Sequence, residues 1–370
     1  MKLTVTAKIK ISPSPEQKEL LCQTLRAYQL ASQFISKLVF DEKVLHQQKL
    51  HLLTYRKLRA DFQLRSQMAQ SVMKTVIARY KSIQGNGHPW TLVRFKRPEL
   101  DLVWNRDYSM SNQMFSINTL SGRIKVPFES KGMEHYLDGT WAFGTAKLVH
   151  KRGKFFLHIP VTQVVNEPSV HDIERIVGVD MGINFIAVSY DSQGTTAFFH
   201  GRRIKNQRSK YKRLRKRLQQ IGTASARRAI QRIGQRENRY MTDVNHRISK
   251  ALVDRYGANT LFVVEDLTGI RQVTERVRIR DRYETVSWSF YQLRQMIEYK
   301  AIRSGAKVIA ANPKYTSQKC PKCEHTNKAN RDRKKHLFCC KECGYSSNDD
   351  RIGAMNLQRI GMKYIAEVAV

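Results

Sequence analysis

The sequence predicts a multidomain α+β protein, and three observations support this fold class. Short strands with alternating apolar and polar residues dominate positions 90–165, whereas apolar strands alternate with helical stretches from about position 175 onward. Five of the six cysteines gather in one local segment, 320–343. Strands that alternate with helices are typical of an α/β sheet. At 370 residues the chain is long enough for two or three domains.

The N-terminal half is predicted to be a β unit with an inserted pair of helices. Residues 3–11 alternate as in a half-buried strand. Ser14 and Gln17 then supply a capping box, and apolar residues recur at helical spacing as far as about position 38. A second helix is expected over 66–81. We expect the first strand to join the strands that follow these helices.

Short strands and then an α/β region are predicted along the rest of the chain. A polar, proline-containing linker near 166–175 separates the two. The expected strands before the linker are 92–95, 114–117, 124–126, 146–149 and 155–159. After the linker we expect strands at 176–179, 185–190, 195–200, 260–264 and 307–311, with helices near 205–256 (broken around 222–223), 290–304 and 350–361.

The charge of the chain points to a polyanionic partner. The sequence has 66 Lys and Arg against 31 Asp and Glu, a net charge of +35 and a pI near 10.2. Self-repulsion of this size destabilises a compact fold unless a polyanion is normally present, so nucleic acid is the expected partner, bound in a salt-dependent way. The alternatives are a merely soluble basic surface and, with less support, an anionic membrane surface.

The apolar segments predict a cytoplasmic protein without a membrane partner. No stretch of about 18 apolar residues occurs, which argues against a membrane-spanning helix. The N-terminus alternates like a strand instead of forming the unbroken apolar block of a signal peptide.

Three carboxylates are candidates for a metal-dependent active site. Asp180 and Glu265 each stand where an apolar strand ends, and Asp350 begins the last predicted helix. If the two strands are neighbours, their carboxylates project into the same crevice, where the active sites of open α/β sheets lie. Clustered carboxylates need divalent cations, and an oxygen-rich open site suits Mg²⁺. The alternative for each acid is an ordinary turn or helix cap, which fits the adjacent Asp266 and Asp349 better.

Four cysteines have the spacing of a structural zinc site. Two CxxC pairs, Cys320 with Cys323 and Cys340 with Cys343, are separated by 16 residues. Four thiolates close a tetrahedral coordination sphere, so one structural Zn²⁺ is expected. Cys339 is excluded because it lacks the CxxC spacing; reduced cysteines packed in a core are the alternative. Nearby cations suit phosphate contact: Lys319, Lys322, Lys328, Arg331, Arg333, Lys334, Lys335 and Lys341.

A basic tract without acidic residues runs from position 192 to 236. A narrow apolar stripe within it predicts a helix with one docked face, and the one-sided charge favours phosphate contact over a merely solvated face. The candidate nucleic-acid-binding residues are Arg202, Arg203, Lys210, Lys212, Arg213, Lys216, Arg227 and Arg228.

Taken together, these motifs resemble the TnpB family, transposon-encoded relatives of type V CRISPR effectors. Order and spacing agree from about residue 175 to the C-terminus, while the N-terminal half fits by texture alone. The motifs are Gly178-Val-Asp180-Met-Gly182, Gly222-Thr223, Ala226-Arg227-Arg228, Asn245-His246, Val264-Glu265-Asp-Leu267, Tyr315-Thr-Ser-Gln-Lys-Cys320, Cys343-Gly344-Tyr345, Asn348-Asp-Asp350 and Ala354-Met-Asn356-Leu357.

The resemblance implies a domain arrangement. Residues 171–314 and 346–370 would form an RNase H-like (RuvC) nuclease domain, interrupted by a zinc-binding, target-nucleic-acid-binding module at 315–345. Residues 1–12 and 85–170 would form a β-barrel wedge domain, with a helical recognition lobe at 13–84. Ile352-Gly353-Ala354 departs from the family's Asn-Ala-Ala-like run but keeps its register, which favours Asp350 over Asp349 as the third acid.

The resemblance also implies an activity. Asp180, Glu265 and Asp350 would be the catalytic triad and would bind two Mg²⁺. The protein would be an RNA-guided double-stranded DNA endonuclease of a transposon. It would hold a guide RNA from the transposon end and cut targets beside a short flanking motif. One copy of the chain per RNA and a nucleoid-associated location in a prokaryote are expected. The alternatives are an RNA-guided repressor that does not cut, and an RNase H-fold recombinase or transposase.

Overall fold

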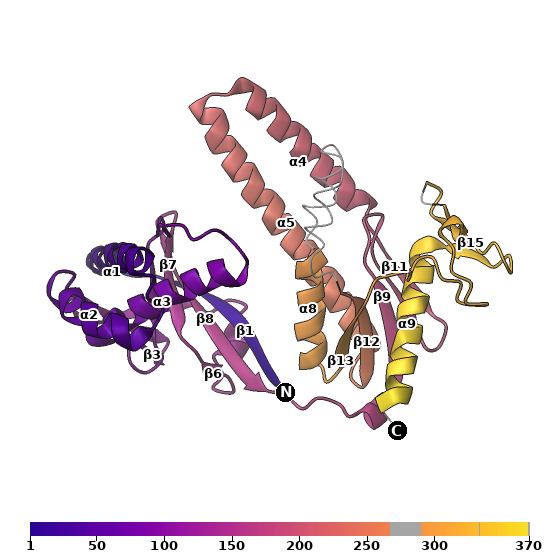
Figure 1. Cartoon of the computed structure of the whole chain (residues 1–370), viewed down its shortest axis with the longest axis horizontal. Helices are drawn as coiled ribbons and strands as arrows, with labels where there is room; N and C mark the ends of the chain where they lie inside the picture. Colours follow the sequence, from indigo (N-terminus) through magenta and orange to yellow (C-terminus); the bar gives the residue numbers. More distant parts are fainter. Residues whose placement is uncertain (267–289, 333, 369–370) are drawn as a thin grey trace. The chain divides into compact units, whose positions relative to one another are not determined.

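The computed structural model describes residues 1–266, 290–332 and 334–368 (Figure 1). Two residues that the sequence analysis named, Leu267 and Arg333, lie outside the described part of the chain. The chain divides into two compact units, Lys2–Val164 and Val165–Val370, the second including Met1. The finer division into wedge domain, helical lobe and inserted module stays a prediction. In the described part of the chain, no helix has the length and apolar character needed to cross a membrane.

An eight-stranded sheet forms the N-terminal unit, with strand order β2-β7-β8-β1-β5-β4-β3 and β6 paired to β8. Its first strand lies antiparallel to β8 along its whole length, from Lys2 opposite Val164 to Ile11 opposite Phe155. The prediction that the first strand joins the later strands is therefore confirmed. The strands are β1 Lys2–Ile11, β2 Glu99–Leu102, β3 Tyr108–Ser111, β4 Met114–Thr119, β5 Gly122–Glu129, β6 Ala142–Phe143, β7 Ala146–Lys151 and β8 Lys154–Val164.

Three helices are inserted between β1 and β2: α1 Pro15–Glu42, α2 Gln47–Ala60 and α3 Ser66–Gly85. The predicted capping box at Ser14 and Gln17 is present, with both reciprocal bonds formed. The sequence prediction missed α2. This helix has no side-chain cap at His46 and buries only three residues, so its start signal and its apolar stripe are both weak: Leu50, Thr54 and Leu58.

The predicted strand at 92–95 is wrong, because this segment bonds to helix side chains instead of to a strand. The Val93 N–H donates to the Tyr80 hydroxyl at 3.2 Å, and its carbonyl accepts from the Ser36 hydroxyl at 2.7 Å. The Phe95 N–H donates to Gln33 Oε1 at 3.0 Å. An apolar tetrapeptide thus satisfies its backbone without a sheet, which its composition does not reveal.

The C-terminal unit is built on a five-stranded sheet of order β11-β10-β9-β12-β13. The pairs β9–β10 and β10–β11 are antiparallel, and β12 runs parallel to both β9 and β13. All five strands occur where the sequence predicted them. They are β9 Arg175–Asp180, β10 Phe185–Asp191, β11 Thr196–His200, β12 Thr260–Glu265 and β13 Lys307–Ala311.

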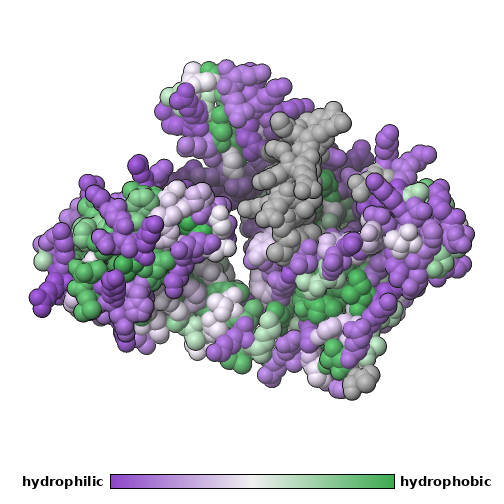
Figure 2. Space-filling view, viewed as in Figure 1, coloured by the Kyte–Doolittle hydropathy of each residue, from purple (hydrophilic) through white to green (hydrophobic). Residues whose placement is uncertain are grey.

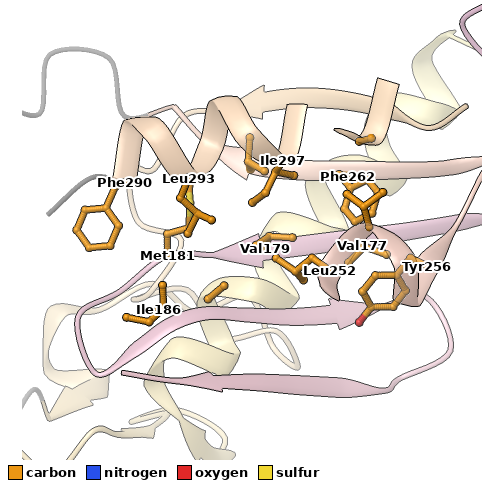
Figure 3. Packing of buried hydrophobic residues seen from close by; sticks show 14 of the residues in the cluster. Val177, Val179, Met181, Ile186, Leu252, Tyr256, Phe262, Phe290, Leu293 and Ile297 are labelled. Carbon is orange, nitrogen blue, oxygen red and sulfur yellow. The ribbon is translucent and has the colours of Figure 1, made fainter. Parts of the chain in front are cut away.

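Helices cover both faces of this sheet. On one face, α5 (Ala224–Tyr256) and α8 (Phe290–Arg303) pack over the outward side chains of β9, including Val177 and Val179 (Figure 3). The opposite face is covered by α9 (Asp349–Val368). A Cβ at Gly178 would lie 2.0 Å from the Ala354 carbonyl oxygen, so glycine there allows α9 to lie directly on the strand.

The last helix is longer than predicted. Gly361 was expected to end it, but the helix continues to Val368. Gly361 is a packing residue: a Cβ there would lie 2.5 Å from Ile176 Cγ2 and 2.7 Å from Val263 Cγ2. The glycine therefore serves the same close contact between helix and sheet as Gly178, and it does not act as a helix terminator.

A long helical hairpin joins β11 to β12, made of α4 (Arg202–Ile221) and α5. The predicted break is confirmed: Gly222 has φ +69° and ends α4, and the Thr223 hydroxyl caps α5.

Candidate active site and metal centre

The three candidate carboxylates line one cavity of the C-terminal unit, with a volume of about 330 Å³. Asp180 ends β9 and Glu265 ends β12, and the parallel pairing of Val179 with Val264 brings these ends to the same edge of the sheet. Asp350 lies in the first turn of α9, which packs on β9. The cavity is thus assembled from two neighbouring strand ends and one helix start.

The carboxylates of this cavity resist ionisation. Burial, then the charges of Glu265 and Asp350, raise the pKa of Asp180 well above its ordinary value. Burial also raises the pKa of Glu265, whose Oε1 accepts a hydrogen bond from the Thr316 hydroxyl at 3.2 Å. The pKa of Asp350 rises to about 6, mainly through burial and then through the charge of Asp349. Such a cluster of acids favours the approach of cations.

Two glycines border the carboxylates, and one of them, Gly353, lets Asp180 lie directly against α9. A Cβ at Gly353 would lie 2.9 Å from Asp180 Cγ and 3.1 Å from both of its carboxylate oxygens. A Cβ at Gly182 would lie 3.0 Å from the Phe185 carbonyl oxygen and 3.7 Å from Asp350 Oδ2. The departure from the family's Asn-Ala-Ala-like run at Gly353 therefore falls directly against the first acid.

Sequence reasoning missed Arg331 as a member of this site. It was counted among the basic residues near the cysteines, but its side chain lines the cavity. Its Nε donates to Asp349 Oδ2 at 2.8 Å and its Nη1 to Ser317 Oγ at 2.9 Å, while Nη2 lies 3.6 Å from Asp350 Oδ1. Arg331 lies between the two CxxC pairs among several other basic residues, and nothing in the sequence distinguishes it from them.

Asp349 supports the site from behind. Its side chain is fully buried and is held by Arg331, with His336 Nδ1 at 3.7 Å from Oδ1. Asp349 was expected to be a turn residue or helix cap, but it is the first residue of α9, and the Asn348 side chain caps the helix by accepting the N–H groups of Asp350 and Arg351 at 3.1 Å each. Asp349 therefore fixes the guanidinium that faces the cavity.

Four cysteines form the second candidate site. The sulfurs of Cys320, Cys323, Cys340 and Cys343 all lie within 4.8 Å of one another, and Cys339 is not part of the group. Backbone N–H groups, led by that of Cys343, lower the pKa of Cys340 to about 6, which favours the thiolate that binds metal. A small sheet supports them: β14 Arg331–Asp332, β15 Leu337–Cys339 and β16 Ser346–Asn348.

These cysteines could hold a structural Zn²⁺, because four converging thiolates fill a tetrahedral sphere. Within the described ranges they are the one group of three or more potential ligands that meets this 4.8 Å limit. The three carboxylates do not meet this limit as a group, although the side chains of Asp180 and Glu265 are close enough to hydrogen-bond.

The basic tract forms the α4–α5 arm, which Figure 2 shows covered largely by hydrophilic side chains. The structure separates its cations into two groups. Glu237 is buried on α5 and pairs with Arg208 at 3.5 Å and Arg215 at 2.5 Å, which ties the two helices together. All eight candidate nucleic-acid-binding residues are exposed: Arg202, Arg203, Lys210, Lys212, Arg213, Lys216, Arg227 and Arg228.

Two family models match the chain. Residues 158–272 match a model described as a probable transposase, and residues 290–357 match one described as a Cas12f1-like TNB domain. A TnpB-like protein of Methanocaldococcus jannaschii is 26% identical over 62% of this chain and 82% of its own length. Both family models and this relative are similar to the chain in the region that carries its resemblance to the TnpB family. The resemblance stated from the sequence is thereby confirmed.

Other TnpB-related proteins are named as nucleases. The CRISPR-associated endodeoxyribonuclease Cas12f1 of Sulfoacidibacillus thermotolerans is 30% identical over 61% of this chain and 55% of its own length. The putative RNA-guided DNA endonuclease InsQ of Escherichia coli is 28% identical over 66% of this chain and 64% of its own length. The chain thus spans about half the length of the Cas12f1 proteins that it matches.

Solved structures give a more distant likeness. A cryo-EM structure of a Cas12f1–sgRNA–target DNA complex covers 96% of this chain and 99% of its own, at 15% identity and a TM-score of 0.41. This TM-score is too low to define a shared arrangement of the domains.

Proposed function

We propose that this chain is a Mg²⁺-dependent, RNA-guided double-stranded DNA endonuclease of a transposon, with an RNase H-like (RuvC) nuclease domain. The observation that carries the proposal is the cavity at the ends of β9 and β12, where Asp180, Glu265 and Asp350 meet. The similarity to proteins named as Cas12f1 endodeoxyribonuclease and as a putative RNA-guided DNA endonuclease supports a nuclease that acts on DNA under RNA guidance.

The three carboxylates of the cavity are suited to binding divalent cations. Three carboxylates with raised pKa values lie together, and a cation would take the place of the protons that they retain. Asp180, Glu265 and Asp350 would hold the ions. Two bound Mg²⁺ supply a Lewis acid for the scissile phosphate and a water of lowered pKa.

The protein's own side chains have distinct tasks in this proposal. Thr316 orients the Glu265 carboxylate through its hydrogen bond. Arg331, fixed by Asp349 and Ser317, presents positive charge to a phosphate in the cavity and stabilises the charge that develops on it during cleavage. Because this charge is held in place before the substrate arrives, little reorganisation is needed during reaction.

Most contacts with nucleic acid would lie outside the cavity. The exposed cations of the α4–α5 arm suit phosphate contact, and the zinc-binding module at 315–345 would contact the target DNA. The N-terminal unit would hold the guide RNA and read a short motif beside the target. One chain per RNA and a cytoplasmic, nucleoid-associated location complete the proposal.

The test is cleavage by the chain together with its own RNA. The gene would be expressed with its native flanking DNA, and the purified complex would be given Mg²⁺ and plasmids matching the RNA beside a randomised motif. Asp350→Asn is expected to abolish cleavage while RNA and DNA binding stay near normal. The matched control is Asp243→Asn, because Asp243 is exposed and pairs with Arg247 on the same helix.

Each outcome decides between functions. Match-dependent cleavage by the wild type and the control, but not by Asp350→Asn, establishes the nuclease. RNA-dependent binding without cleavage indicates a repressor instead, and strand joining without RNA indicates a recombinase. Unchanged cutting by Asp350→Asn rejects the assignment of this residue.

A further inference from the structure

A second hollow lies next to the carboxylate cavity, and the two share one lining residue, Thr316. This hollow, here called the Tyr315 groove, has a volume of about 290 Å³ and runs between segment 314–319 and the exposed side of α9. Thr316 lines both the groove and the carboxylate cavity. The groove is defined by Tyr315, Lys319, Asn356, Arg359, Ile360 and Lys363.

The wall between the two hollows is rigid. The Thr316 hydroxyl donates to Glu265 on the cavity side. On the groove side, Asn356 Nδ2 donates to the carbonyl oxygens of Thr316 and Lys319, at 2.7 Å each. Thr316 is therefore the lining residue that the cavity and the groove share, and hydrogen bonds hold it on both sides.

The charge of the groove suits a phosphodiester chain. Lys314, Lys319, Arg359 and Lys363 line it, against one acid, Glu324. The Glu324 carboxylate is engaged by Lys319 at 2.9 Å and by Arg359 at 3.5 Å. Four cations against one acid leave the groove positively charged, and Lys314 and Lys363 add to the cations that hold Glu324.

The groove also has the apolar surfaces that a nucleobase needs. Tyr315 is 51% exposed, and Lys314 Nζ lies 5.1 Å from the centre of its ring. Its φ of +66° is unusual for a residue with a side chain. Ile360 and Met362 add apolar surface, the latter 45% exposed. An exposed ring beside fixed cations is the composition of a single-strand binding site.

We propose that the Tyr315 groove binds one nucleotide of single-stranded DNA that flanks the phosphate in the carboxylate cavity, with its base on Tyr315 and its phosphate on Lys363. This proposal rests on the proposed nuclease function. The groove would fix which phosphate of a bound strand reaches Asp180 and Glu265, and would thus act as a positioning site for cleavage.

Photo-crosslinking tests the groove without any cleavage. The full chain with its bound RNA would be irradiated with a short oligodeoxynucleotide that carries 5-iodouracil, and the crosslinked peptide identified by mass spectrometry. We expect a crosslink at Tyr315 that is lost in Tyr315→Ala. The matched control is Tyr291→Ala, because Tyr291 is similarly exposed, at 56%, on α8. Crosslinks only outside segment 314–319 and α9 would overturn the proposal.

Cleavage rates supply the second readout. Removing a base-stacking ring costs about a tenfold or greater loss of single-strand affinity, so Tyr315→Ala should slow cleavage at subsaturating DNA by about tenfold and shift the cut positions. Tyr315→Trp should restore both, and Lys363→Ala, on the exposed side of α9, should weaken binding without lowering the melting temperature. Wild-type rates and cut positions in both alanine variants would reject the groove.

The outcomes separate the two proposals. A Tyr315 crosslink in a wild type that cuts nothing rejects the nuclease and retains the groove as a binding site. Cleavage without the crosslink rejects the groove alone. Equal or stronger crosslinking by an oligoribonucleotide of the same sequence rejects DNA as the occupant.

Discussion

The two candidate metal sites of the C-terminal unit are built in opposite ways. The four cysteine sulfurs all lie within 4.8 Å of one another. The three carboxylates line an open cavity of about 330 Å³ and hold their protons more tightly than ordinary acids. The cysteine site is closed by its own ligands, which suits a structural ion. The carboxylate site keeps room for a substrate oxygen, which suits catalysis.

The largest effect on folding is expected when the cysteine site loses one of its four ligands. Cys340→Ser removes one of four ligands and should abolish zinc binding and unfold the small sheet around it, because a structural zinc contributes its binding energy directly to folding. Metal analysis should fall from about one zinc per chain to none. Cys339→Ser is the matched control, since Cys339 neighbours the site without belonging to it. A zinc-free wild type that is fully folded would contradict the closed site.

A smaller, purely catalytic effect is expected at the open site. Arg331→Lys keeps a positive charge but loses the fork that reaches Asp349, Ser317 and Asp350, so the cleavage rate at saturating DNA should fall by about 10²-fold. Lys328→Ala, an exposed cation of the same module, should leave that rate near the wild-type value. If both variants lose only affinity, then Arg331 is a phosphate contact and has no part in the chemical step.

The same comparison explains what the sequence could predict. A CxxC turn is local, so spacing alone was enough to choose the four cysteines and to reject Cys339. The carboxylates come from distant segments, and their meeting depends on the parallel pairing of β9 with β12. The strand ends were visible in the sequence as apolar runs followed by an acid.

The walls of the cavity were not predictable from the sequence in the same way. Arg331 and Thr316 reach it only because the cysteine module packs beside α9, a tertiary contact with no periodic signature. The missed helix α2 and the wrong strand at 92–95 have a related cause. One has too few buried residues to show a stripe, and the other is held by side chains that are distant in sequence.

A third prediction concerns the stability cost of the open site. The raised pKa of Asp180 means that the folded state binds its proton more tightly than the unfolded state, so the wild type loses stability as the pH rises through that pKa. Asp180→Asn removes this ionisable group, and with it the free-energy cost of burying Asp180, so it should raise the melting temperature at pH 7.5 in Mg²⁺-free buffer by about 2–4 °C. The difference should shrink at lower pH and when Mg²⁺ stabilises the wild type. A variant that melts lower at every pH would show that the carboxylate stabilises the fold.

The smallest expected effect tests the contact between helix and acid. In Gly353→Ala the new Cβ would lie 2.9–3.1 Å from the Asp180 carboxyl group, which must turn aside because α9 is held on the sheet by Gly178 and Gly361. The cleavage rate should fall several-fold, by about 1 kcal/mol of transition-state stabilisation. The melting temperature should stay level, since alanine favours a helix over glycine by a similar amount.

Gly234→Ala is the matched control for this last change. Gly234 also lies within a helix, α5, but a Cβ there would meet no atom within 4 Å. The same substitution should therefore raise the melting temperature slightly and leave cleavage unchanged. If Gly353→Ala behaves like Gly234→Ala, the Asp180 carboxyl group has room to move without losing function. In that case the carboxylate site would tolerate a shift of one ligand, whereas the cysteine site is expected to fail when it loses one.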